Sequence, residues 1–115
     1  MNIDIHKRED GVVVQLRGQL VAGTGDRVVR EVVEEVYADG WELLLLDLSA
    51  VSKIDSSGIG ELVAAYKLSR SLERDFALIQ VEAPLRRIMD LSNLLPLIPV
   101  FHSEEEALQS LRSIQ

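Results

Sequence analysis

Residues 43–60, LLLLDLSAVSKIDSSGIG, decide the fold of this chain. The run LLLLDL at 43–48 is almost wholly apolar, which favours a strand covered on both faces in the middle of a sheet. A helix is predicted over 57–74, because an apolar stripe recurs there at helical spacing, formed by Ile59, Leu62, Val63 and Tyr66. The stretch DSSG joins these two elements. Since functional groups in open α/β sheets collect beyond the carboxyl ends of strands, DSSG is also the first candidate site.

Strands and helices alternate along the rest of the chain. Apolar patterns predict strands at 2–6, 12–17, 76–81 and 98–101, and further helices over 24–38, from Pro84 and after Ser103. Asp10-Gly11 supplies turn chemistry for a hairpin between the first two strands. The order is therefore β-β-α-β-α-β-α-β-α. It predicts a single α/β domain over residues 1–115, with a mixed, mostly parallel sheet and crossover helices.

Single residues predict where the helix at 24–38 begins and ends. Thr24 is a plausible N-cap, because its side-chain oxygen can accept a backbone hydrogen bond. Gly40 can end the helix in a left-handed conformation. Arg30 and Glu34 are four residues apart, so their opposite charges are expected to meet on the outer helix face.

Two residues of the C-terminal part predict local features of the last strand and the last helix. Pro99 cannot donate a hydrogen bond to a neighbouring strand, so the strand at 98–101 should lie at a sheet edge. Ser103 with Glu106 three residues later forms a capping box for the last helix.

The composition excludes several classes of function. The net charge is −7, whereas a general nucleic-acid binder should carry a basic surface. The absence of cysteine excludes a disulfide framework, a thiolate zinc site and a cysteine nucleophile. The N-terminus shows no long apolar segment, and no apolar run is long enough to cross a bilayer. We therefore expect a cytoplasmic protein without a signal peptide, membrane insertion or direct nucleic-acid binding.

The two serines of DSSG have three possible roles. The first is structural, because Asp55 or Ser56 could cap the following helix. The second is nucleophilic catalysis, which needs a base, yet His6 lies in the opening strand and His102 near the last helix. The glycine that should stand two residues before the serine of a nucleophile elbow is also missing. We therefore expect no catalytic residue, no enzyme activity, no metal site and no cofactor.

The third role is phosphorylation. A serine at a helix N-terminus is exposed, and nearby free N–H groups can receive phosphate oxygens. A phosphate adds about −1.5 to −2 charges at neutral pH. The helix end favours this charge and Asp55 opposes it, so the fold should survive. Like charges that face each other in an interface can cost several kcal/mol, so one phosphate could release a partner pressed against this surface.

The stretch LLLLDLSAVSKIDSSGIGELVAAYK at 43–67 resembles the signature of STAS domains, in particular of the bacterial anti-sigma-factor antagonists. The resemblance extends over nearly the whole chain. It includes the β-β-α-β-α order, GQL at 18–20, PLRRIMDLSNLLPLIPVF at 84–101 and the final EEEAL helix. DSSG by itself is unspecific, but DSSG behind a strand carrying LDLS is specific in a chain of this length and order.

The resemblance implies a partner switch in bacterial stress signalling. In that family the partner is an anti-sigma factor that is also a serine kinase, and it phosphorylates the serine directly after the aspartate. The unphosphorylated antagonist binds this kinase and frees a sigma factor, which activates transcription. The phosphorylated form lets go, and a separate PP2C-type phosphatase resets it. ATP belongs to the kinase, so the antagonist needs no cofactor and performs no chemistry of its own.

Carried over by position, the acceptor is Ser56. The loop and helix start that should bind the partner around it comprise Asp55, Ser57, Gly58 and Ile59. Asp47 falls on an aspartate common in the family's preceding strand, which implies a supporting, positioning role. The helix that follows should form much of the partner-facing surface.

This sequence departs from the family pattern at two places. Many antagonists read Gly-Glu-Leu-Asp where residues 18–21 read Gly-Gln-Leu-Val, so both acids are replaced, by Gln19 and Val21. These replacements motivate an alternative function, a constitutive STAS scaffold module in a signalling or lipid-transport complex without phospho-switching. Family members also often have a glycine pair before the fourth strand, where this chain has Glu73, Arg74 and Asp75.

Overall fold

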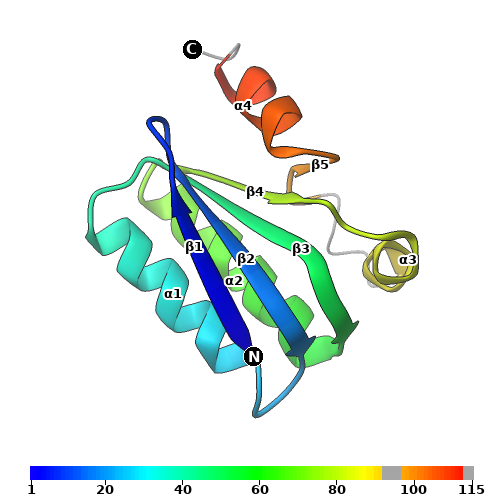
Figure 1. Cartoon of the computed structure of the whole chain (residues 1–115). Coiled ribbons are helices and arrows are strands. Elements are labelled where there is room, and N and C mark those ends of the chain that lie inside the picture. The colour runs from blue at the N-terminus through cyan, green and yellow to red at the C-terminus, as the bar shows by residue number, and fades with distance from the viewer. Residues whose placement is uncertain (92–96, 113–115) are drawn as a thin grey trace.

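The computed structural model describes residues 1–91 and 97–112, so residues 92–96 of the motif at 84–101 lie outside the described part. Within these ranges the elements follow the predicted order (Figure 1). They are β1 (Asn2–Lys7), β2 (Val12–Leu20), α1 (Asp26–Ala38), β3 (Leu43–Ile54), α2 (Ser56–Ser71), β4 (Asp75–Ile79), α3 (Ala83–Leu91), β5 (Val100–Phe101) and α4 (Glu104–Arg112). No helix of the described residues is long and apolar enough to cross a membrane.

The strands form one mixed sheet in the order β1-β2-β3-β4-β5. β1 and β2 pair antiparallel, and the other neighbouring strands pair parallel. β3 lies at the centre and every residue from 43 to 48 is buried, which confirms the prediction from its continuous apolar run. β5 lies at an edge, as Pro99 predicts.

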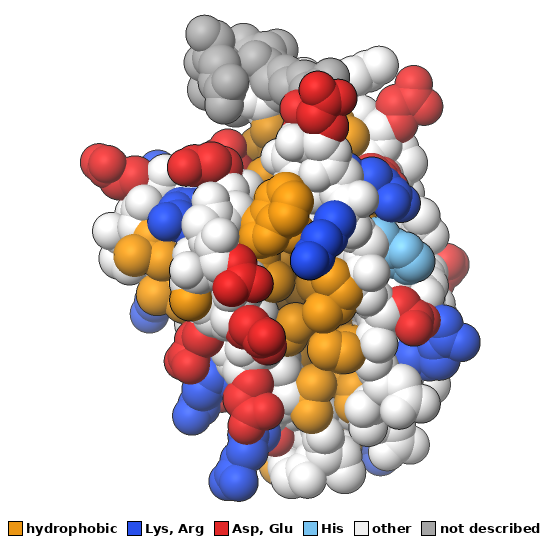
Figure 2. Space-filling model, turned by 60° about the vertical axis from the view of Figure 1, so that its left-hand side comes forward, with side chains coloured by type: hydrophobic (Ala, Val, Ile, Leu, Met, Phe, Trp, Pro, Cys, Tyr) orange, Lys and Arg blue, Asp and Glu red, His pale blue; other side chains and the backbone are white. Residues whose placement is uncertain are grey.

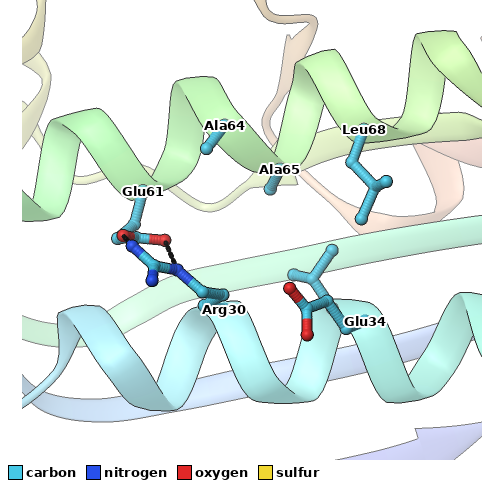
Figure 3. A pocket seen from close by; sticks show the side chains of 7 residues that line it. Arg30, Glu34, Glu61, Ala64, Ala65 and Leu68 are labelled. Atoms are coloured by element: carbon cyan, nitrogen blue, oxygen red, sulfur yellow. Dashed lines mark hydrogen bonds and ion pairs between the residues drawn. The ribbon is translucent and has the colours of Figure 1, made fainter.

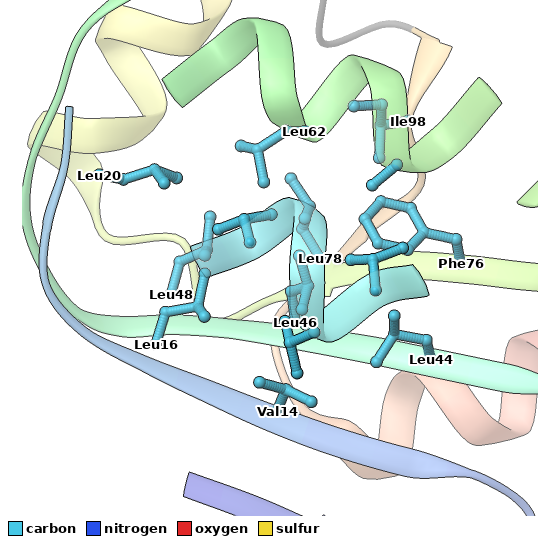
Figure 4. Close-up of a cluster of buried hydrophobic side chains, with 14 of the residues drawn as sticks. Val14, Leu16, Leu20, Leu44, Leu46, Leu48, Leu62, Phe76, Leu78 and Ile98 are labelled. Carbon is cyan, nitrogen blue, oxygen red and sulfur yellow. The ribbon is translucent and has the colours of Figure 1, made fainter. Parts of the chain in front are cut away.

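Two apolar clusters pack on the two faces of the sheet. Successive side chains of a strand point to opposite faces, so Leu44 and Leu46 join the larger cluster while Leu43 and Leu45 join the smaller one. The larger cluster includes the buried apolar side chains of α1 and α2, which lie side by side along the sheet, and Figure 4 shows its leucines converging. The smaller cluster includes Ala107 of α4. β3 therefore anchors both layers.

The central strand is longer than predicted. Its apolar run ends at 48, but β3 continues to Ile54 and pairs with the whole of β2, up to Leu20 opposite Ile54. The second half is only partly covered, so its burial is intermittent and the continuous apolar signal is lost. The extension carries the DSSG corner to the far end of β2.

The start of α1 also differs from the prediction. The helix begins at Asp26, and Gly25 is its N-cap without any side-chain hydrogen bond. The Thr24 hydroxyl instead donates to the carbonyl oxygen of Val21 at 3.3 Å, inside the preceding turn. Thr24 is therefore not the cap. Gly40 does adopt the expected left-handed conformation after the helix, with φ +94°.

Two further helix ends can be compared with their predictions. α2 starts at Ser56 and stops at Ser71, three residues before the predicted end at Arg74. Glu73 then adopts φ 57°, and the Arg74 guanidinium donates to the carbonyl oxygens of Tyr37 at 2.7 Å and Trp41 at 2.9 Å.

At α4, the Ser103 hydroxyl accepts a hydrogen bond from the Glu106 backbone N–H at 3.1 Å, as expected for its cap.

Candidate functional site

The DSSG stretch lies at a corner where the ends of β2 and β3 meet the start of α2. Asp55 is the N-cap of α2, and its Oδ1 accepts a hydrogen bond from the Gly58 backbone N–H at 3.0 Å. Its Oδ2 accepts a second one from the Ala22 backbone N–H, also at 3.0 Å. These bonds, first to Ala22 and then to Gly58, lower the pKa of the Asp55 carboxyl. Asp55 and not Ser56 therefore caps the helix, and it also holds the loop after β2.

Gly58 allows this corner to close. A Cβ built on Gly58 would lie 2.1 Å from the carbonyl oxygen of Leu20, and also 2.9 Å from the Cγ1 of Ile54. The first turn of α2 thus presses directly on the backbone at the end of β2, and no side chain fits between them. The glycine of DSSG is required by close packing.

The two serines differ in exposure. Ser56 is the first residue of α2 and is exposed, whereas Ser57 is half-buried. Gly58 and Ile59 are buried beneath them. Because Asp55 performs the capping, Ser56 has no capping role and remains an exposed residue at the helix N-terminus.

The other predicted residues differ in how close they lie to the DSSG corner. Gln19 is exposed at the end of β2, in register with Lys53, and Val21 follows in the loop that Asp55 holds through Ala22. Both residues that replace the usual acids, Gln19 and Val21, therefore belong to the same corner as Ser56. Asp47 is not brought into it. Asp47 is buried in the first half of β3, where its Oδ1 accepts a hydrogen bond from the Ser49 backbone N–H at 2.8 Å.

No base accompanies the serines in the part of the chain that the structure describes. His6 lies in β1 and His102 follows β5, and among the described residues neither histidine is hydrogen-bonded to Ser56 or Ser57. Residues 1–91 and 97–112 also hold no group of three or more His, Cys, Asp or Glu side chains suited to a metal ion. The corner offers an exposed residue with a hydroxyl at a helix start, and both oxygens of the neighbouring Asp55 carboxylate already accept backbone hydrogen bonds.

One feature beside the corner was missed by the sequence reasoning. Glu61 of α2 is buried, and Arg30 of α1 forms an ion pair with it, whereas Arg30 was expected to meet Glu34 (Figure 3). The hydrogen bond to Glu61, more than its charge, raises the pKa of Arg30. The available signal was the spacing of Glu61, three residues after Gly58 and four before Ala65, which places these residues on one helix face. Helical spacing predicts partners within one helix only, and this partner lies on another.

The surface shows no basic patch on the face drawn in Figure 2. Lysine and arginine side chains are scattered among acidic ones, and acidic residues stand beside an apolar stripe. This distribution on the visible face agrees with the expectation from the net charge of −7.

Known proteins are similar to this chain in both sequence and fold. A family model described as STAS domain matches residues 2–107. The anti-sigma F factor antagonist of Paenibacillus polymyxa is 28% identical over 114 residues, which cover 99% of this chain and 97% of the relative. The anti-sigma-B factor antagonist of Listeria monocytogenes is 29% identical over 109 residues, or 92% of this chain and 95% of the relative.

A solved structure gives the same result. The crystal structure of an anti-sigma factor antagonist from Mycobacterium paratuberculosis superposes with a TM-score of 0.84 at 25% identity, and the match covers 96% of this chain and 93% of that one. These relatives are named as antagonists and not as enzymes, in agreement with the expected lack of catalysis. The sequence signature around DSSG, the mixed five-stranded sheet and the match over residues 2–107 together show that the chain belongs to the STAS domain family.

Proposed function

We propose that this protein is an anti-sigma-factor antagonist that is switched off by phosphorylation of Ser56. Unphosphorylated, it binds an anti-sigma factor that is also a serine kinase, and a sigma factor is released. The observation that carries this proposal is the exposed Ser56 hydroxyl at the start of α2, with capping already supplied by Asp55. A PP2C-type phosphatase would reset the switch in the cytoplasm.

Exposure favours Ser56 over Ser57 as the acceptor. A kinase must bring the hydroxyl to the phosphate of ATP, so the acceptor oxygen has to protrude from the protein. Ser56 is exposed, whereas Ser57 is half-buried and Gly58 behind it has no room for even one further atom toward Leu20. The corner therefore supports transfer to the first serine.

A phosphate at Ser56 would act on the partner more than on the fold. It would stand at the positive end of the α2 dipole, which is favourable, and next to the Asp55 carboxylate, which is not. The bonds of Asp55 to Ala22 and Gly58 do not involve the Ser56 hydroxyl, so phosphorylation of this hydroxyl removes neither donor nor acceptor from them. An anti-sigma factor seated on this corner would meet the added charge directly.

One observation favours a second candidate, the constitutive STAS scaffold without a phospho-switch. Gln19 and Val21, which replace the acids usual in antagonists, lie at the same corner as Ser56. A partner adapted to this less acidic corner need not be a kinase. The two candidates differ in one measurable respect, since only the first makes partner binding depend on the charge at Ser56.

The test is a capture experiment from the lysate of the native host with four baits. Ser56→Ala and Ser56→Asp probe the acceptor, and Ser57→Ala and Ser57→Asp are matched controls one residue away. We expect Ser56→Ala to retain an ATP-binding kinase that Ser56→Asp loses, with both Ser57 variants retaining it. If all four baits hold the same proteins, the switch is refuted and the scaffold function stands. A phosphate mapped to Ser56 in native cells would count against the scaffold.

A further inference from the structure

The proposed function gives no role to a groove that lies between α1 and α2. It holds a cavity of about 170 Å³ between the two helices. Val33 of α1 and Ala65 and Leu68 of α2 form its apolar floor, and Figure 3 shows the two helices contributing side chains from opposite sides. Small-molecule pockets usually measure about 300–1,000 Å³. The cavity therefore suits a single large apolar side chain better than a whole small molecule.

The groove borders a stripe of α2 that starts at the proposed phosphorylation site. Ser56, Gly60 and Ala64 are spaced four residues apart, so they share one face of the helix, and all three are exposed. A Cβ added at Gly60 would meet nothing within 4 Å. With so little side-chain volume on this stripe, another helix can approach α2 closely from Ser56 down to the mouth of the groove.

The charges at the rim are unequal. Arg30 is neutralised by Glu61, through two hydrogen bonds, one of them from Nε to Oε2 at 3.3 Å. Glu34 also lines the groove, is exposed, and forms no ion pair with any residue that the structure describes. Next to an apolar cavity, the rim thus presents the Glu34 carboxylate, which has only a longer-range attraction to Arg30 and no ion pair among the described residues. Its complement is an apolar side chain with a lysine or arginine nearby.

We propose that the α1–α2 groove is a second docking point for the anti-sigma factor, occupied by one helix of that partner. The helix inserts an aliphatic or aromatic side chain over Val33, Ala65 and Leu68 and places a lysine or arginine against Glu34. A second copy of this chain fits less well, because it brings another net charge of −7. This inference rests on the proposed function. It adds that the partner contacts a surface beyond the serine corner. The groove then contributes to the affinity for the partner, and the serine corner controls release by phosphorylation.

Two pairs of variants test the groove against matched controls. Ala64→Arg obstructs its mouth, and Ala38→Arg adds the same side chain at an exposed alanine at the end of α1. Glu34→Lys reverses the rim charge, and Glu35→Lys makes the same change one residue away, at an exposed position that does not line the groove. Binding is measured by calorimetry with the purified kinase captured on Ser56→Ala. Circular dichroism checks that each variant is folded.

We expect Ala64→Arg to weaken binding at least tenfold and Glu34→Lys about threefold to tenfold, since charge pairs at an interface contribute modestly. Both controls should stay within about twofold. The deficit of Glu34→Lys relative to Glu35→Lys should shrink in 1 M salt, where exposed charges are screened.

The outcomes separate this inference from the proposed function. If Ser56→Asp loses the kinase while Ala64→Arg and Glu34→Lys bind as tightly as their controls, the groove proposal is wrong and the phospho-switch stands. Should Ala64→Arg fail to fold, Glu34→Lys against Glu35→Lys still decides the question. If no anti-sigma factor binds any Ser56 bait, the proposed function fails and the groove proposal fails with it. Self-association that Ala64→Arg abolishes would replace the partner helix by a second copy.

Discussion

Asp55 accepts a hydrogen bond from the backbone N–H of Ala22 at 3.0 Å, across 33 positions of the chain. The same carboxylate caps α2 through Gly58. One side chain thus fixes the loop after β2 against the helix that presents Ser56. The geometry of the proposed switch depends on this link, and its ionisation should be visible in the stability of the protein.

The first prediction is a pH-dependent contribution of Asp55 to stability. The hydrogen bonds lower its pKa in the folded state below the ordinary value of 3.8. A lowered folded pKa stabilises the fold above the unfolded pKa, and this stabilisation is lost as the pH falls through the folded pKa. In urea unfolding, the wild type should exceed Asp55→Asn in stability at pH 7. The two should converge well below pH 3.8. A difference that stays constant with pH would show that the carboxylate charge is irrelevant.

The second prediction compares two glycines of α2. Gly58→Ala places a methyl group 2.1 Å from the Leu20 carbonyl oxygen, so it should destabilise the protein by about 1–3 kcal/mol or more. Gly60→Ala meets nothing within 4 Å and should stabilise the exposed helix by about 0.5–1 kcal/mol. Both are read from the urea midpoint. Equal effects at the two positions would contradict the close approach of α2 to β2.

The third prediction concerns the turn before β4. Glu73 adopts φ 57°, a left-handed conformation that costs a non-glycine residue about 1–2 kcal/mol. Glu73→Gly should therefore raise the free energy of unfolding, by about 1 kcal/mol at most, since glycine also gains entropy in the unfolded chain. Glu42→Gly, at an exposed glutamate before β3, serves as a comparison that should give no such gain. Thermal unfolding of both variants provides the measurement.

The fourth prediction tests the central strand. Leu46 has no exposed surface and lies in the larger cluster, so Leu46→Ala should cost about 2–5 kcal/mol. Leu91 at the end of α3 is 78% exposed, and Leu91→Ala should change stability by no more than about 0.5 kcal/mol. Chemical denaturation of the two variants measures the difference. Comparable losses would mean that the core is not centred on β3.

The fifth prediction separates switching from unfolding. Ser56→Asp adds negative charge at an exposed helix start whose cap is already supplied, so its free energy of unfolding should change by no more than about 0.5 kcal/mol. Its circular dichroism spectrum should match that of the wild type. If Ser56→Asp were instead unfolded, loss of a partner by this variant would reflect damage to the fold and not a switch.

Much of this architecture could be predicted from local patterns. The apolar run at 43–48 identified the central strand, Pro99 the edge strand and Ser103 the cap of α4. These properties depend on the intrinsic chemistry of short segments. A strand that meets no solvent on either face selects apolar side chains, and a proline, which lacks a backbone N–H, cannot donate a hydrogen bond to a neighbouring strand. The position of DSSG between a strand and a helix followed from the same reasoning.

Contacts between distant segments were decided only by the tertiary structure. The extension of β3 to Ile54 depends on its pairing with β2. The partner of Arg30 depends on the packing of α1 against α2. The need for a glycine at position 58 depends on the position of the Leu20 backbone. A sequence pattern records which side a residue faces, but not which side chain or backbone atom it meets there. By itself, then, the sequence determined the order of the elements and the location of the exposed serine. The three-dimensional fold decided which residue caps the helix, which side chain pairs with Arg30 and where the groove between α1 and α2 lies.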